Sequence, residues 1–310
     1  MRLLHITTSL YTGGAETLIV NLMPRFKALG YEVGVVVFNA ERTPLMERLE
    51  KECPECKIYC LGHSYYNPLY IVKLIRIMRH YDIIHTHNSS PQLFAAIANI
   101  FCRKKLVTTE HNTNNRKREK GGIFRLVDIW MYRRYNDIIC ISEIAEKKLR
   151  EYLGNIDGQH VCTINNGVDV EMFHNAVPLL ELKTGKFVVV MVAGFRKQKD
   201  QDTLIKAMLL LPKEQYELWL VGDGVRRGEL QNLVRNLNLQ GYVKFLGLRT
   251  DVPNVLKSAD VVVMSSHWEG LSLSNVEGMS VGKPFVASDV NGLREVTKDY
   301  GILFPHEDEK

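Results

Sequence analysis

The sequence predicts an α/β protein made of two doubly wound parallel sheets, one in each of two domains that face a central cleft. At 310 residues, the chain exceeds the usual size of a single domain. Apolar, β-rich runs alternate with amphipathic helical segments, which is typical of parallel sheets. The alternation breaks once, in a loose segment around Pro178, Thr184 and Gly185. We therefore assign residues 1–170 to an N-terminal domain, 171–186 to a linker and 187–310 to a C-terminal domain.

The first domain shows the alternation from its first residues. Residues 2–9 form an apolar, β-rich run, and the helix that follows to about residue 29 repeats its apolar side chains on one face. The later segments follow the same rule. The predicted strands after the first are 32–38, 57–61, 82–87, 106–111, 137–142 and 160–164, and the predicted helices after the first are 43–51, 69–79, 91–101, 124–135 and 143–153.

Several residues of this domain are placed where ligands of such sheets bind, beyond the carboxyl ends of the strands. Gly13 and Gly14 begin the first helix, where the absence of side chains lets the backbone approach a phosphate, although tight packing of strand on helix explains such glycines too. His87 and His111 each end a strand, so both should face one cleft. His85 and His87 share a strand face. With no third ligand evident, we favour a pocket-lining role for this pair over a metal site.

The second domain repeats the alternation after the linker. The run at 187–193 is continuous, apolar and rich in β-branched residues, as expected of a strand that is buried on both faces. The remaining predicted strands are 216–221, 243–246, 260–264, 285–288 and 301–304. The predicted helices are 202–211, 227–237, 253–258 and one that opens within 265–282.

The stretch 265–282 carries the strongest functional signal. A strand, a turn and a helix follow one another, and the free amides of the first helical turn favour an anion. We expect these amides to come from Gly270, Leu271, Ser272 and Leu273. Two carboxylates, Glu269 and Glu277, flank the turn with seven residues between them. Carboxylates beside a phosphate site make sense if the ligand also carries hydroxyl groups, as a nucleotide sugar does.

Other residues would complete such a site. Arg196 and Lys199 follow the strand 187–193, and two cations there could clamp a diphosphate and stabilise it as a leaving group. Backbone groups around Gly247 and Leu248 are the expected contacts of the base. Gly13 and Gly14 would close on the phosphate from the other domain.

Composition limits the partners. A net charge of +5 does not argue for nucleic acid and is compatible with an anionic ligand or an anionic membrane surface. No run approaches transmembrane length, and the start lacks a signal-peptide core, so we expect a cytoplasmic protein. The basic stretch 112–122 is either a solvated loop or a contact for anionic lipid or an anionic acceptor, which would place the protein on the inner face of the membrane.

The six cysteines are scattered, as expected for buried free thiols in a reducing compartment. One group, Cys53, Cys56, Cys60 and His63, has a spacing that could hold zinc or iron–sulfur. Because only one Cys-x-x-Cys pair is present, coincidental thiols in a surface loop are the preferred interpretation.

Taken together, six short motifs resemble those of the retaining family 4 glycosyltransferases, over essentially the whole chain. These enzymes have the architecture called GT-B, with two Rossmann-like domains. The motifs are, in order, Gly-Gly-Ala-Glu at 13–16, His111, Asn-Gly-Val-Asp at 166–169, Lys199, Gly-Asp-Gly at 222–224, and the pair Glu269 and Glu277.

The resemblance implies an enzyme of the hexosyltransferase type that acts in cell-surface polysaccharide synthesis. It would move a sugar from a UDP- or GDP-sugar to a hydroxyl group of a glycan or lipid-linked acceptor, with retention and without a bound metal or cofactor. Glu277 would hold the ribose and Glu269 the transferred sugar. Arg196 and Lys199 would bind the diphosphate, and His111 would contact the sugar and help to position the acceptor.

Two departures from the family pattern stand out. The family places an arginine directly after the glycine that ends the first strand of the second domain. Aligned on Lys199, that position is Gly194 here, and Arg196 lies two residues further on. The chain also stops soon after its last strand, so we expect a truncated C-terminal domain. A nucleotide-sugar epimerase of similar shape and a non-catalytic nucleotide-sugar-binding protein are the alternative functions.

Overall fold

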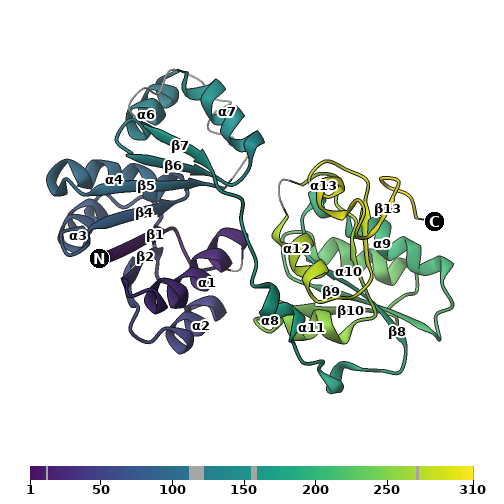
Figure 1. Cartoon of the computed structure of the whole chain (residues 1–310). Coiled ribbons are helices and arrows are strands. Elements are labelled where there is room, and N and C mark those ends of the chain that lie inside the picture. Colours follow the sequence, from purple (N-terminus) through teal and green to yellow (C-terminus); the bar gives the residue numbers. More distant parts are fainter. Residues whose placement is uncertain (12, 112–121, 155–158, 270–271, 310) are drawn as a thin grey trace. The chain divides into compact units, whose positions relative to one another are not determined.

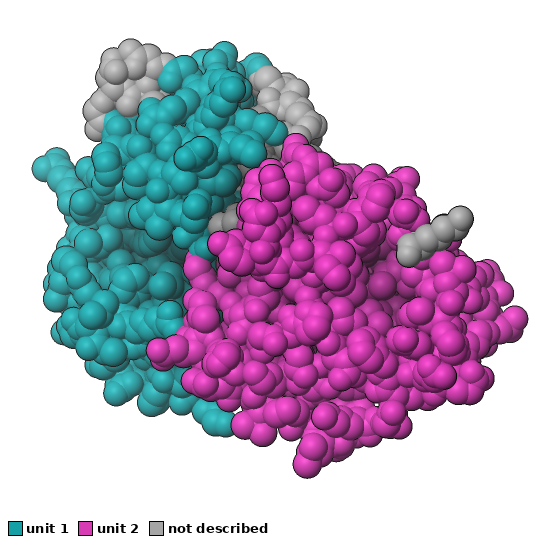
Figure 2. Space-filling view, turned by 45° about the vertical axis from the view of Figure 1, so that its right-hand side comes forward, with its two compact units in different colours: residues 1–166 teal, residues 167–310 magenta. Residues whose placement is uncertain are grey.

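The computed structural model describes residues 1–11, 13–111, 122–154, 159–269 and 272–309. The chain divides into two compact units, Met1–Asn166 and Gly167–Lys310, each with a parallel sheet of its own. Figure 1 labels the elements and Figure 2 colours the two units. The predicted fold class, two doubly wound Rossmann-like parallel sheets, is confirmed.

Unit 1 holds a seven-stranded parallel sheet in the order β3-β2-β1-β4-β5-β6-β7. Its strands are β1 Arg2–Thr7, β2 Glu32–Asn39, β3 Lys57–Gly62, β4 Ile83–His87, β5 Lys105–Glu110, β6 Asp137–Cys140 and β7 His160–Thr163. The helices described in unit 1 are α1 Gly14–Ala28, α2 Pro44–Glu52, α3 Leu69–Met78, α4 Ser89–Cys102, α6 Ile123–Tyr132 and α7 Glu143–Leu153.

Apolar side chains cover both faces of this sheet. In β2, Val35 and Val37 pack into a cluster with residues of α1 and α2. Between them in sequence, Val36 packs into a second cluster with residues of α3, α4, α6 and α7. Because successive side chains of a strand point to opposite faces, burial on both faces requires a continuous apolar run. This explains why the strands lack an alternating polar pattern.

Unit 2 holds a six-stranded parallel sheet in the order β10-β9-β8-β11-β12-β13. Its strands are β8 Phe187–Val192, β9 Tyr216–Val221, β10 Val243–Gly247, β11 Val261–Met264, β12 Phe285–Ser288 and β13 Ile302–Phe304. Its helices are α8 Val170–His174, α9 Gln201–Ala207, α10 Arg227–Asn236, α11 Val252–Ser258, α12 Leu273–Ser280 and α13 Arg294–Thr297, with short 3-10 helices η1 Leu180–Leu182, η2 Lys197–Lys199 and η3 Met208–Leu210.

One segment of unit 2 differs from what its composition suggests. Residues 171–186, predicted as a linker, include most of α8, whose Phe173 is buried in the apolar core of unit 2. The side chain of Asp169 caps this helix by accepting a hydrogen bond of 3.1 Å from the amide of Met172. A single helical turn is too short to show a helical period in sequence. Asp169, a residue type that is common at helix N-caps, is the feature of the sequence that indicates this helix.

The strand order determines where each unit can bind a ligand. In unit 1 the order reverses between β1 and β4, and in unit 2 it reverses between β8 and β11. At such a switch point the chain leaves two neighbouring strands in opposite directions, which opens a crevice beyond their carboxyl ends. Each unit therefore has one switch point of this kind. Gly13 and Gly14 follow β1, Arg196 and Lys199 follow β8, and Glu269 follows β11, all strands that border a switch point, whereas His111 follows β5 and Leu248 follows β10.

No helix in the described parts of the chain combines the length and the apolar character needed to cross a membrane.

Candidate functional site

At the carboxyl ends of its strands, unit 2 has two loops in close contact. The loop after β8 lies against the loop after β9, and the amide of Phe195 donates a hydrogen bond of 2.9 Å to the carbonyl oxygen of Asp223. A Cβ atom at Gly224 would come within 2.6 Å of the carbonyl oxygen of Phe195. Gly222 has φ +135°, and a Cβ atom there would overlap the carbonyl oxygen of Ala193. The two glycines of Gly-Asp-Gly are thus required by packing.

Lys199 and Glu269 form an ion pair at the switch point of unit 2. Lys199 ends η2, directly after β8, and its Nζ contacts Oε1 of Glu269, which follows β11. The two side chains are only 17% and 6% exposed. Because β8 and β11 are neighbours at the switch point, their loops meet although the residues lie 70 positions apart. The sequence predicted both residues for the site but did not predict that they pair.

The carboxylate of Glu269 is held by further donors. Ser266 Oγ donates a hydrogen bond of 2.6 Å to Oε1, and Nε2 of Gln198 lies 3.4 Å from Oε2. The amide of Glu269 donates to the carbonyl oxygen of Asn291 at 3.2 Å. Ser266 and Gln198 were missed by the sequence analysis, because serine and glutamine in loops carry no signal without their long-range partners. These bonds fix the carboxylate in the loop that follows β11.

Asp200 fixes the other side of the pair. It adopts φ +46° and caps α9 through a hydrogen bond of 3.3 Å from the amide of Thr203. Its carbonyl oxygen accepts a hydrogen bond of 2.8 Å from Ser265 Oγ, which ties the loop after β8 to the loop after β11. Arg196 lies three residues before Lys199 and is exposed. Its side chain has no hydrogen bond or ion pair with any residue that the structure describes.

The helix α12 carries Glu277. Ser272 precedes its first residue, Leu273, and Glu277 is partly buried in the second turn. Next to it, Gly278 packs so closely on the sheet that an added Cβ atom would lie 2.6 Å from Cε2 of Phe285. Glu277 is engaged with a neighbouring group of the chain. Gly270 and Leu271, two of the predicted amide donors, lie outside the described residues.

Gly247 and Leu248 follow β10. Gly247 adopts φ +69°, in the left-handed region that favours glycine, and its carbonyl oxygen accepts a hydrogen bond of 2.8 Å from the amide of Gly222. Leu248 is 49% exposed. This backbone therefore lies next to the loops that border the crevice, with an apolar side chain facing solvent.

In unit 1, Gly13 and Gly14 begin α1 directly beyond the carboxyl end of β1. Gly13 has an extended backbone with φ −162°, and a Cβ atom there would lie 2.5 Å from Oε2 of Glu16. The flexible carboxylate of Glu16 could move away from such an atom, so neither packing nor a special backbone conformation requires glycine here.

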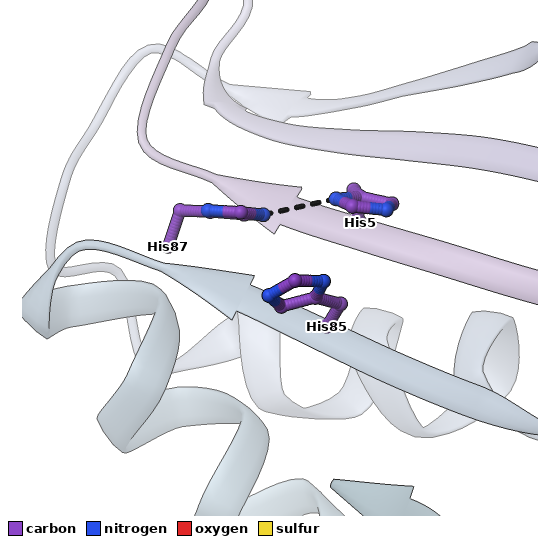
Figure 3. Close-up of side chains that lie close together, drawn as sticks. All are labelled: His5, His85 and His87. Carbon is purple, nitrogen blue, oxygen red and sulfur yellow. Dashed lines mark hydrogen bonds between the residues drawn. The ribbon is translucent and has the colours of Figure 1, made fainter. Parts of the chain in front are cut away.

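Four histidines of unit 1 lie together on β1, on β4 and directly after β5, and three of them are connected end to end. Nε2 of His111 lies 2.9 Å from Nδ1 of His87, and Nε2 of His87 lies 2.9 Å from Nδ1 of His5. His85 stacks on His87 with 4.4 Å between ring centroids and bonds Thr109 Oγ1 at 2.7 Å. Figure 3 shows His5, His85 and His87, which come from β1 and β4.

Burial keeps these imidazoles neutral. Desolvation lowers the pKa of His85 to about 3 and that of His111 to about 4. The same cause lowers the pKa of His5 and of His87 well below the ordinary value, and neighbouring imidazoles add to the effect. None of the four imidazoles should carry a positive charge near neutral pH. His111 can therefore contact a ligand only as a neutral donor or acceptor of hydrogen bonds.

The sequence analysis missed His5, although it paired His85 with His87. His5 lies beside His85 in the parallel register of β1 and β4. The ligand nitrogens of His5, His85 and His87 lie within 4.8 Å of one another, close enough to be considered as a metal site. The rings argue against it, because His85 and His87 stack at 29° instead of directing their lone pairs at a common point.

The cysteines and the basic loop add little to the site. Cys53 and Cys56 are buried in the core beside α1 and α2, whereas Cys60 is exposed. Burial raises the pKa of Cys56 to about 12, which leaves it a thiol. Across the described ranges, these cysteines and His63 do not gather as a group of metal ligands. Most of the basic stretch 112–122 lies outside the described residues.

Comparison with protein families covers nearly the whole chain. The family model described as Glycosyltransferase Family 4 matches residues 12–172, and the model described as Glycosyl transferases group 1 matches residues 177–310.

Two bacterial relatives with assigned activities illustrate the similarity. The UDP-Gal:alpha-D-GlcNAc-diphosphoundecaprenol alpha-1,3-galactosyltransferase of Escherichia coli is 29% identical over 74% of this chain and 64% of its own length. The N-acetylgalactosamine-N,N'-diacetylbacillosaminyl-diphospho-undecaprenol 4-alpha-N-acetylgalactosaminyltransferase of Campylobacter jejuni is 26% identical over 95% of this chain and 83% of its own length. The match thus spans less than two thirds of the E. coli enzyme.

Among solved structures, HepE of Anabaena in complex with UDP and glucose is similar with a TM-score of 0.82, at 23% identity, over 100% of this chain and 87% of that chain. The complex of the same protein with UDP-glucose has a TM-score of 0.81 with 86% of that chain covered. At this level of identity the likeness establishes the fold.

Proposed function

The chain belongs to glycosyltransferase family 4, and from this we propose a retaining enzyme that moves a sugar from a UDP- or GDP-sugar to a hydroxyl group of a glycan or lipid-linked acceptor. The observation that carries the proposal is the Lys199–Glu269 pair at the switch point of unit 2. It joins a cation that suits a diphosphate to a carboxylate that suits sugar hydroxyls. Neighbours of similar fold that bind UDP and UDP-glucose support a donor of this class.

We assign the donor to the crevice of unit 2. Arg196 and Lys199 bind the diphosphate, and Glu269 accepts hydrogen bonds from hydroxyl groups of the transferred sugar. The amides of Gly270, Leu271, Ser272 and Leu273 add donors to the phosphate oxygens. Glu277 accepts both ribose hydroxyls, and the backbone at Gly247 and Leu248 contacts the base. The ammonium group of Lys199 then interacts with both Glu269 and the diphosphate.

In the proposed reaction, the bond between the anomeric carbon and the β-phosphate oxygen breaks, and the acceptor oxygen forms a bond to the anomeric carbon on the same face. The acceptor hydroxyl gives its proton to the departing phosphate oxygen. Arg196 and Lys199 offset the negative charge that grows on that oxygen, where preorganised cations contribute most. His111 and the glycines Gly13 and Gly14 of unit 1 serve the sugar, the phosphate and the acceptor.

The acceptor suggests where the enzyme works. Relatives named for undecaprenyl-diphosphate acceptors support a lipid-linked acceptor, and thus a role in surface polysaccharide assembly at the inner face of the membrane. The net positive charge of +5 suits an anionic surface. A vesicle-binding assay with anionic and neutral lipids tests this location, and equal binding to both would argue against it.

The function is tested by a screen of UDP- and GDP-sugars with lipid-diphosphate sugar acceptors, which follows the release of free nucleoside diphosphate. We expect release only when an acceptor is present, and a product with the anomeric configuration of the donor. Isomerised donor without acceptor would identify an epimerase. Binding without turnover would identify a nucleotide-sugar-binding protein.

Two substitutions separate the assigned roles. Glu277→Ala should weaken binding of UDP itself by about 10- to 100-fold, because a charge-assisted hydrogen-bond acceptor is lost. Glu269→Gln should weaken binding of the UDP-sugar without weakening that of UDP, because Lys199 then keeps its charge for the diphosphate. Calorimetric titration measures both, and Glu214→Ala, which removes an exposed carboxylate of unit 2, is the control. An unchanged affinity of Glu277→Ala for UDP would contradict its assignment.

The expected independence from metals remains a prediction. The Asp-x-Asp triplet Asp200-Gln201-Asp202 is engaged within the fold, because Asp200 caps α9 and Asp202 pairs with Arg226. Two cations already face the proposed diphosphate site. We expect EDTA to leave the turnover unchanged. If EDTA lowers the turnover and added Mg²⁺ restores it, a metal ion would be the partner of the diphosphate in place of Arg196.

A further inference from the structure

The three connected histidines of unit 1 constrain one another's hydrogen positions. A neutral imidazole carries one hydrogen, so it donates through one nitrogen and accepts through the other. His87 uses both nitrogens, toward His111 and toward His5, at 2.9 Å in each case. Only two arrangements satisfy both bonds. The hydrogens run either from His5 outward to His111 or from His111 inward to His5.

The inner end of the chain decides between the two. Nε2 of His5 is buried and has no hydrogen-bond partner among the described residues, and His5 itself is fully buried. In the inward arrangement this nitrogen would carry an N–H without a partner. Orphaned buried N–H groups are rarer than under-used acceptors, so the inward arrangement is the more costly one.

The phenyl ring beside His5 does not rescue that N–H. The ring of Phe26 lies 5.9 Å from His5 between centroids, and the two planes are inclined by only 32°. An N–H that lies in the imidazole plane therefore points nearly along the face of Phe26 instead of toward it. A contact between the N–H and the π electrons needs the opposite orientation.

We infer that the chain runs outward: His5 Nδ1–H donates to His87 Nε2, and His87 Nδ1–H donates to His111 Nε2. His111 is thereby held with its hydrogen on Nδ1. This is the nitrogen that neither His87 nor any other described residue engages, so His111 presents a donor to its ligand. His5 and His87 are positioning residues for His111, and their effect on catalysis rests on the proposed function.

Nitrogen-15 NMR of the full chain, labelled at its histidines and kept near neutral pH, tests the inference without substrate. Long-range proton–nitrogen correlations separate a nitrogen that carries hydrogen from one with a lone pair, and the resonances that vanish in His111→Gln identify His111. We expect hydrogen on Nδ1 and a lone pair on Nε2. Hydrogen on Nε2 of His111, or an equal mixture, would overturn the inference.

Two replacements of His87 sharpen the test. His87→Asn keeps an amide donor where Nδ1 was and should preserve the Nδ1–H form of His111. His87→Phe removes both hydrogen bonds and should release His111 to a mixture of the two forms. His160→Gln, an exposed histidine of β7, is the matched control and should change nothing. Should His87→Phe not fold, the wild-type and His87→Asn spectra still decide the question.

Turnover provides a second, separate readout. If His111 serves the reaction, His87→Phe should lower kcat/KM by about 10-fold through one misplaced hydrogen bond, and His87→Asn should restore most of it. Equal losses in the two variants would overturn the positioning role. Absence of transfer in the wild-type enzyme would instead count against the proposed function, and it would leave the tautomer result as measured.

Discussion

At the scale of single residues, Lys199 and Glu269 show how an ion pair can serve a site before any ligand arrives. The carboxylate of Glu269 is almost fully buried and accepts hydrogen bonds from Ser266 and Gln198 as well as from Lys199. A buried charge is stable only when it is paired. The pair therefore keeps both charges in place beyond the carboxyl ends of β8 and β11, where the proposed donor would use them.

This pairing predicts the effect of removing one partner. Lys199→Met should lower the free energy of unfolding by about 3 kcal/mol, because Glu269 is left buried without its cation. The double variant Lys199→Met/Glu269→Gln should recover much of that loss. Urea unfolding measures both. A double variant as unstable as the sum of the single ones would show that the two charges do not depend on each other.

The control for this measurement is an exposed pair. Arg42 and Glu50 form an ion pair with side chains that are 61% and 44% exposed. Solvent screens such pairs, so Arg42→Ala should hardly change the free energy of unfolding.

At the scale of elements, α12 connects packing to the site. The helix carries Glu277, and its neighbour Gly278 lets the helix lie directly on the sheet, against Phe285 and Val262. A larger residue at position 278 would lift the helix from the strands. The position of Glu277 thus depends on a glycine in the helix interior, where glycine is otherwise unfavourable.

Gly278→Ala should therefore destabilise the protein by about 1–3 kcal/mol, because the added Cβ atom overlaps Phe285 and the helix must shift. It should also weaken UDP binding under the proposed function. Gly228→Ala in α10 is the matched control, because nothing lies within 4 Å of its added Cβ atom. That change should stabilise the protein slightly, by about 0.5–1 kcal/mol. Thermal unfolding and calorimetric titration measure these effects.

At the scale of the whole molecule, the two units differ in how they should respond to acid. The histidines with lowered pKa values lie in unit 1. Among the described residues of unit 2, His267 keeps access to solvent, and no histidine there is buried. In multidomain chains the units can unfold in separate transitions, so each unit can show its own dependence on pH.

We expect unit 1 to lose stability as the pH falls below about 6.5. The unfolded state then binds protons at these histidines, whereas the folded state does not until the pH approaches about 4 for His111 and about 3 for His85. Because the unfolded state binds more protons in this window, the free energy of unfolding falls by about 1.4 kcal/mol per pH unit for each such histidine.

Fluorine NMR of 5-fluorotryptophan-labelled protein can follow the two units separately during urea unfolding. Trp130 lies in unit 1, and Trp219 and Trp268 lie in unit 2. Between pH 7.5 and pH 5, the midpoint at Trp130 should move to lower urea and that at Trp219 should hardly move. His5→Phe should reduce the dependence at Trp130. Equal shifts at both tryptophans would contradict the prediction.

Much of the fold could be predicted from local sequence. Continuous apolar runs such as 187–193 indicated strands that are buried on both faces, and their alternation with helices indicated parallel sheets. Short elements were harder. The helix α8 is a single turn inside a segment rich in loop residues, and α13 has only four residues, so neither shows a period that sequence analysis can detect.

The sequence by itself determined the two parallel sheets, the family and the candidate residues, because apolar periodicity and short motifs depend on neighbours along the chain. The roles assigned to Arg196, Lys199, Glu269, Glu277 and His111 remain predictions. Only the tertiary structure brought Lys199 to Glu269 and aligned His5 with His85 and His87. Both arrangements depend on which strands are neighbours in a sheet and in what register. Contacts between distant segments decide that order, and no short stretch of sequence contains them.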